Sequence, residues 1–141
     1  MRTRQHGFTL VELLVVIVVI AILAATAIPV FLAQRQKGYA AQVQSALKNA
    51  ATAVEAYGTD NEGDYSGLET VPDLTATMRA NGFSVPSWAT SFDVVASSTN
   101  YCIEIRHARA TASTGWRRAT YFGDRGAPGP SPDHCPAAPA L

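Results

Sequence analysis

The stretch GFTLVELLVVIVVIAILAATAIPVFLAQ, residues 7–34, decides how this chain folds. Residues 13–33 hold no charged side chain, and as an α-helix they would span about 30 Å, which matches the hydrocarbon core of a bilayer. A single acid, Glu12, stands immediately before this run. Because a carboxylate within a bilayer is costly, its presence suggests a partner for the charge.

Two interpretations of this stretch compete. A secretory signal peptide would combine the basic residues Arg2 and Arg4, the apolar run and a small-residue cleavage site at residues 25–27. The run is longer than the roughly 7–15 residues of a signal-peptide core, and an acid at its start gives such a peptide no advantage. The other interpretation is a helix that the mature protein keeps, in which case the cost of Glu12 has to be offset.

The same residues resemble the class III leader and N-terminal helix of type IV prepilins. That family has a short basic leader ending in glycine, then phenylalanine, then glutamate as the fifth residue after the cut; here these are Gly7, Phe8 and Glu12. The resemblance covers roughly the first 35 residues. It is specific because the cleavage residue, the glutamate spacing and the long apolar helix occur together.

The resemblance implies that a prepilin peptidase cuts between Gly7 and Phe8, which removes a leader of residues 1–7, and that the new amine of Phe8 is methylated. It also implies that Glu12 pairs with the Phe8 amine of a neighbouring subunit during assembly. Pairing would recover much of the cost of a charge in a dry environment and would set the axial register. A glutamate merely tolerated at headgroup level is the alternative.

Pro29 lies inside the apolar helix and predicts a kink or weak point around residues 25–29, because proline removes a helix hydrogen bond. Pilins commonly carry a proline at the matching place, where the segment can lose helicity in the fibre; a simple bend is the alternative. Farther along, apolar side chains at three- and four-residue steps predict an amphipathic helix over residues 36–57, which Gly58 would end. This stripe consists of Tyr39, Val43, Leu47, Ala50, Val54 and Tyr57.

The remainder reads as a small head. Residues 58–91 are predicted as a loop region with a short helix starting near Asp73, and residues 92–123 as a small antiparallel β-sheet. The expected fold class is therefore α+β, a long N-terminal α-helix packed on that sheet, which is also the type IV pilin fold. The expected organisation is a leader (1–7), an assembly half of the helix (8–35) and a head (36–141).

The tail, residues 124–141, holds five of the eight prolines and should wrap the head irregularly. A Cys102–Cys135 bond would anchor it by closing a loop of about 34 residues, which contributes roughly 3–4 kcal/mol. A metal site using His107, His134 and both cysteines is the alternative, but the spacing is not that of ordinary zinc sites. The disulfide also matches the C-terminal disulfide loop of type IV pilins.

The residues offer little sign of catalysis or cofactor binding. We find no metalloprotease, nucleophile-elbow or phosphate-loop motif, and expect neither an enzyme, a metal nor a cofactor. An acidic loop, residues 60–69, lacks the spacing of an EF-hand and is better explained as solvated. Net charge is zero over 141 residues, so bulk electrostatics indicates no partner.

Arginines gather on or near the last predicted strands, and with nearby aromatic residues they could touch DNA phosphates and stack on bases. The candidates are Arg106, Arg109, Arg117 and Arg118. Many type IV pili take part in DNA uptake, which makes DNA a candidate partner. Arginines that balance the acidic loop on a solvated edge are the alternative, and we favour it.

We expect a structural subunit, a major or abundant pilin, of a type IV pilus. It would reside in the cytoplasmic (inner) membrane as a single-pass subunit before assembly and in an extracellular surface pilus afterwards. The resemblance implies as partners other copies of itself, prepilin peptidase, an assembly ATPase, an inner-membrane platform protein, minor pilins and, before assembly, membrane lipid. The alternatives are a major pseudopilin of a type II secretion system and a secreted soluble binding domain that begins at Ile28.

Overall fold

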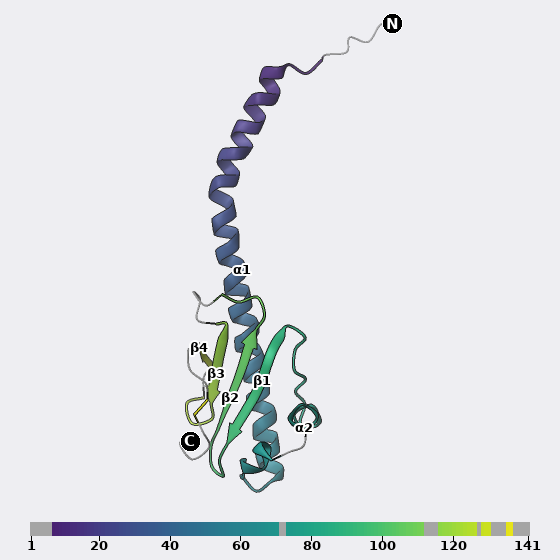
Figure 1. Cartoon of the computed structure of the whole chain (residues 1–141), viewed down its shortest axis with the longest axis vertical. Helices are drawn as coiled ribbons and strands as arrows, with labels where there is room; N and C mark the ends of the chain where they lie inside the picture. Colours follow the sequence, from purple (N-terminus) through teal and green to yellow (C-terminus); the bar gives the residue numbers. More distant parts are fainter. Residues whose placement is uncertain (1–6, 71–72, 112–115, 127, 131–134, 137–141) are drawn as a thin grey trace, which may run out of the picture. The chain divides into compact units, whose positions relative to one another are not determined.

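The computed structural model describes residues 7–70, 73–111, 116–126, 128–130 and 135–136. Figure 1 shows the elements, which are α1 (Leu10–Asp60), a 3-10 turn η1 (Ser66–Glu69), α2 (Leu74–Ala80), β1 (Ala89–Ala96), β2 (Tyr101–His107), β3 (Arg118–Phe122) and β4 (Pro128–Pro130). The chain forms two compact units, Met1–Arg35 and Gln36–Leu141, and the boundary between them falls within α1.

The first unit contains the apolar part of α1. By length and composition α1 is able to cross a membrane, and its most apolar window has no buried residue. Among the described residues, the exposed large apolar side chains run from Phe8 to Leu32. The helix continues across Pro29, and the Thr26 hydroxyl donates to the Leu23 carbonyl at 3.0 Å. The weak point at Pro29 therefore stays a prediction about the fibre.

In the second unit, α1 buries one face. The buried positions are Val43, Ala46, Leu47, Ala50, Ala51, Ala53, Val54 and Gly58, at the spacing of an amphipathic helix. The helix does not end at Gly58, as the sequence suggested, but continues to Asp60. Gly58 is instead a point of close packing, because a Cβ there would collide with the ring of Tyr65.

The four strands form one antiparallel sheet in the order β1-β2-β3-β4. Side chains of β2 alternate, so Tyr101, Ile103 and Ile105 join the core with the buried face of α1 while Cys102 and Glu104 lie on the opposite face. Figure 1 shows the sheet lying across the second half of α1. The predicted α+β pilin fold is confirmed.

Two elements refine the sequence prediction of the head. The short helix α2 is capped by Asp73, whose side chain accepts from the Ala76 amide at 3.0 Å. β4 lies in the tail that was expected to be irregular, and it pairs with β3 through Thr120 and Gly129. Because proline cannot donate a ladder hydrogen bond, this proline-containing strand is tolerated only at the edge of the sheet, which is where it lies.

Candidate functional site: the helix start and the disulfide-closed head

The first turn of α1 holds a reciprocal pair of hydrogen bonds. The backbone amide and the hydroxyl of Thr9 each donate to Glu12 Oε2 at 2.9 Å. In return, the Glu12 amide donates to Thr9 Oγ1 at 3.2 Å. This is a capping box, in which an N-cap threonine and a glutamate three residues later satisfy amides that the helix leaves without partners. Glu12 therefore has a partner within its own chain.

Sequence reasoning missed this role for Glu12 because it looked only for an intermolecular partner. The signal was present as Thr-x-x-Glu directly before an apolar run. A carboxylate has about four acceptor sites, so capping leaves it capacity for a further donor. Gly7 and Phe8 precede the helix outside regular structure, and Phe8 is 81 % exposed. Residues 1–6 of the expected leader lie outside the described residues.

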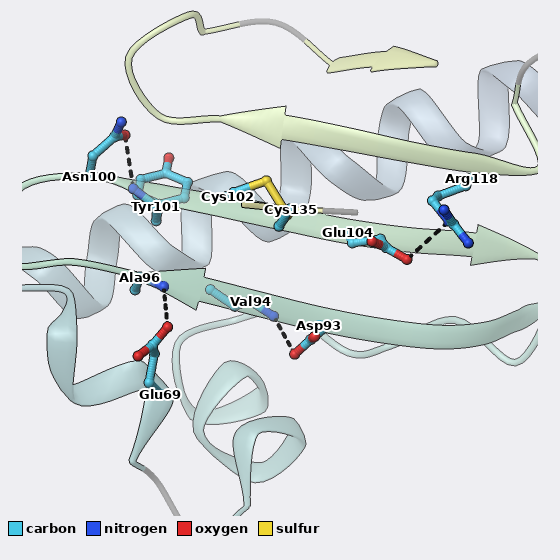
Figure 2. The surroundings of a disulfide bond; sticks show 10 residues. All are labelled: Glu69, Asp93, Val94, Ala96, Asn100, Tyr101, Cys102, Glu104, Arg118 and Cys135. Atoms are coloured by element: carbon cyan, nitrogen blue, oxygen red, sulfur yellow. Dashed lines mark hydrogen bonds and ion pairs between the residues drawn. A yellow bond between two sulfur atoms is a disulfide. The ribbon is translucent and has the colours of Figure 1, made fainter. Parts of the chain in front are cut away.

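The two cysteines form a disulfide, Cys102–Cys135, with a Cα–Cα distance of 5.7 Å. Figure 2 shows it on the face of β2 that points away from the core. The bond ties the tail beyond β4 to an inner strand, and Cys102 itself is fully buried. Because both thiols are consumed, neither is available as a thiolate metal ligand. Of the two histidines in the metal alternative, His134 lies outside the described residues.

Farther along the same face, a buried carboxylate lies between two arginines. Glu104 is 5 % exposed, and its Oε1 lies 3.2 Å from Arg106 Nε and 3.3 Å from Arg118 Nε. Two of the four arginines considered for DNA contact are therefore engaged by this acid. Arg109 and Arg117 are exposed.

His107, at the end of β2, is a buried polar residue of the head, 2 % exposed. Its Nδ1 accepts from the amides of Arg109 and Ala110 at 3.0 and 3.1 Å, so Nε2 carries the hydrogen and donates to Gln42 Oε1 at 3.2 Å. Burial lowers the pKa of His107, and the nearby charge of Arg109 lowers it further. The ring is thus neutral, and it links the backbone at Arg109 and Ala110 to Gln42 of α1.

A second polar contact fixes α1 to the sheet. The carboxylate of Glu55 accepts from the hydroxyls of Tyr101 and Tyr65 at 2.7 and 2.8 Å. Burial and the hydrogen bond to Glu55 raise the pKa of Tyr101, and the hydrogen bond to Glu55 raises that of Tyr65. Both phenols therefore remain protonated donors, and the contact joins α1, β2 and the loop before η1.

The N-terminal part of the chain matches a known family of sequences. Residues 2–28 match the model of the prokaryotic N-terminal methylation motif. Over 135 residues the chain is 34% identical to the type IV wide pilus major component PilA4 of Thermus thermophilus, covering 92% of this chain and 96% of that protein. The chain belongs to the type IV pilin family.

This pilin also resembles components of another system. It is 35% identical to type II secretion system core protein G of Escherichia coli over 89 residues, 57% of this chain and 61% of that protein. The same component of Pseudomonas aeruginosa is 35% identical over 60 residues, 43% of this chain and 42% of that protein. No solved structure gives a significant match.

Membership of the type IV pilin family indicates what the apolar helix does. The protein is a pilin-like structural subunit, anchored in the membrane through its apolar helix, processed by prepilin peptidase and able to self-assemble into filaments. The long exposed run of α1 is then the segment that lipid or neighbouring subunits cover. The site of function is consequently a surface for assembly.

Proposed function

We propose that this pilin is a major or abundant structural subunit of a type IV pilus. The observation that carries the proposal is the 34% identity to a pilus major component over nearly the whole of both chains. The matches to secretion-system core proteins cover smaller shares of this chain. The disulfide that anchors the tail also favours a pilus, because major pseudopilins typically lack it and use a calcium site there.

Processing is the first step of the proposed mechanism. The peptidase cuts between Gly7 and Phe8, both of which lie outside regular structure and ahead of the first helical turn. Methylation of the new Phe8 amine follows, and the apolar helix stays with the protein. The subunit is then held in the cytoplasmic (inner) membrane by residues 8–35.

Assembly is the second step. The Phe8 amine of one subunit approaches Glu12 of its neighbour, whose carboxylate already caps its own helix and has capacity for one more donor. The bundle of helices replaces lipid as the apolar environment, so extraction need not expose the helix to water. An assembly ATPase and a platform protein supply the work, minor pilins join the fibre, and the product is an extracellular pilus.

The experiment that tests this function is intact-mass analysis of fibres sheared from cells. The expected mass is that of residues 8–141, with one amine hydrogen of Phe8 replaced by a methyl group and without the two hydrogens lost in the disulfide, measured on long surface filaments. A chain that begins at Ile28 would contradict the proposal and favour a secreted domain. Correct processing with no surface filament would favour the pseudopilin instead.

A further inference from the structure

The head carries a groove between α1 and the segment that links α2 to β1. Its volume is about 680 Å³, and its lining residues all belong to the compact unit Gln36–Leu141. Small-molecule sites commonly measure about 300–1,000 Å³. The helix contributes one wall at three- and four-residue spacing, and the α2–β1 segment contributes the other. The side chains that matter are Gln42, Ser45, Asn49 and Thr52 on the helix, and Phe83 and Trp88 opposite.

The lining has a definite chemistry, because none of the described residues that line the groove is charged. A nucleic acid, an acidic peptide or a phospholipid headgroup would find no opposite charge there. The side-chain amide of Asn49 and the hydroxyl of Ser45 instead offer both hydrogen-bond donors and acceptors. The Gln42 amide nitrogen adds donors, and the Thr52 hydroxyl, whose hydrogen goes to the Lys48 carbonyl, adds an acceptor. Sugar hydroxyls have the same dual character, so each can donate to one of these groups and accept from another.

The two walls are held in place before any ligand arrives. The Trp88 ring stacks on His107, with centroids 4.6 Å apart and an interplanar angle of 25°. The Gln42 amide oxygen accepts from Nε2 of the same histidine at 3.2 Å. His107 therefore positions one group on each wall, and such preorganisation reduces the entropy lost on binding.

We propose that this groove binds a short neutral oligosaccharide. Trp88 contacts the apolar C–H face of a sugar ring, while Asn49 and Gln42 bond to its hydroxyls. A second copy of the pilin is a poorer occupant. Its apolar helix would cover the amides and hydroxyls of the groove without giving them hydrogen bonds, and burying polar groups in this way is unfavourable.

The test uses the full-length mature protein in micelles of a detergent that has no sugar headgroup. The probes are cellotriose, maltotriose and the trimer of N-acetylglucosamine, with trigalacturonate as the charged control. Saturation-transfer NMR and tryptophan fluorescence measure binding. At least one neutral trisaccharide should bind saturably, and the charged control at least about tenfold more weakly.

Two helix substitutions locate the site. Asn49→Ala should weaken binding about three- to tenfold through lost hydrogen bonds. Thr52→Lys should abolish it, and Thr59→Lys is the matched control. Both threonines are exposed on α1 and donate to the carbonyl four residues back, at 3.1 and 2.9 Å, but only Thr52 lines the groove.

Several outcomes would overturn the proposal. One is the absence of saturable binding by any neutral probe up to about 10 mM. Equal binding by the Thr52→Lys variant, or by the charged control, would place the sugar elsewhere or remove the selectivity for neutral ligands. If no sugar binds and Thr52→Lys, but not Thr59→Lys, stops filament formation, the groove is a subunit contact. None of these results overturns the proposed processing between Gly7 and Phe8 or the pairing of Glu12 with the Phe8 amine, because the groove lies in the head.

Discussion

The two parts of α1 differ in whether their apolar side chains are exposed or buried. From Phe8 to Leu32 the large apolar side chains are exposed, whereas Val43, Leu47 and Val54 of the same helix are fully buried beneath the sheet. The second part therefore has its apolar partners within its own chain, and the first must obtain them from lipid or from other subunits. Substitutions in the first part should change where the subunit goes, and those in the second should change whether the head stays folded.

The largest effect is expected at Glu12. Glu12→Ala removes both the cap and the charge and should abolish filament assembly, while the unfolding temperature of the head stays unchanged. Glu12→Gln separates the two roles, since glutamine also serves at this position of a capping box but carries no charge. If charge pairing drives assembly, both variants fail, as counted by electron microscopy of sheared fibres. Normal fibres from Glu12→Gln would show that the cap alone suffices.

The disulfide should have the next largest effect, and it acts on the head. Replacing both Cys102 and Cys135 with alanine opens a loop with a sequence separation of 33 and should destabilise the head by roughly 3–4 kcal/mol. Denaturant midpoints of the full chain in micelles measure this. Reduction of the wild-type protein is the matched control and should produce a similar shift. Equal midpoints before and after reduction would contradict the prediction.

A smaller effect is expected from acid, through His107. The pKa of His107 is lowered in the folded head, so the unfolded chain binds a proton more readily and acid favours unfolding. This contribution to stability is fully present above the unfolded pKa of about 6.5 and is lost as the pH falls towards the lower folded pKa, by at most about 1.4 kcal/mol per pH unit.

Denaturant midpoints between pH 7 and pH 5 measure the contribution of His107. His107→Gln should be less stable at pH 7, because it loses the acceptor of the Arg109 and Ala110 amides, and its midpoint should change less with pH. An equal pH dependence in the variant would assign the effect to other groups.

The smallest effect is expected at the exposed arginines. Arg117→Ala and Arg109→Ala should leave DNA binding by intact filaments unchanged, since we favour solvated side chains there. Gel-shift titration with sheared fibres at fixed salt checks this. Arg118 is a poor choice for the test because it pairs with Glu104, and its loss would disturb the sheet as well. Loss of binding with normal fibre assembly would support a DNA contact.

Features carried by local patterns could be predicted from the sequence. The apolar run, the stripe from Tyr39 to Tyr57 and the alternation around Ile103 have regular periods, and these give the long helix and the sheet. The two cysteines left only one intramolecular pairing. The Thr9–Glu12 cap is equally local and was missed only because a different role was sought for the acid.

Contacts between distant residues could not be predicted in this way. His107 bonds to Gln42, 65 residues away, and Tyr101 bonds to Glu55, 46 residues away. No periodicity encodes such pairs, since they depend on the register of β2 against α1. The extension of α1 to Asp60 also depends on a contact between residues apart in the sequence. Gly58 allows the ring of Tyr65 to approach the helix closely and does not end it.

The two border strands of the sheet, β1 and β4, carry groups that limit pairing with a strand of another head. On one border, Glu69 Oε1 accepts from the Ala96 amide of β1 at 3.3 Å, as Figure 2 shows, and so occupies a donor that a foreign strand could use. On the other, the prolines of β4 contribute no amide hydrogen. At these border positions, therefore, a strand from a neighbouring head finds no free amide hydrogen with which to pair.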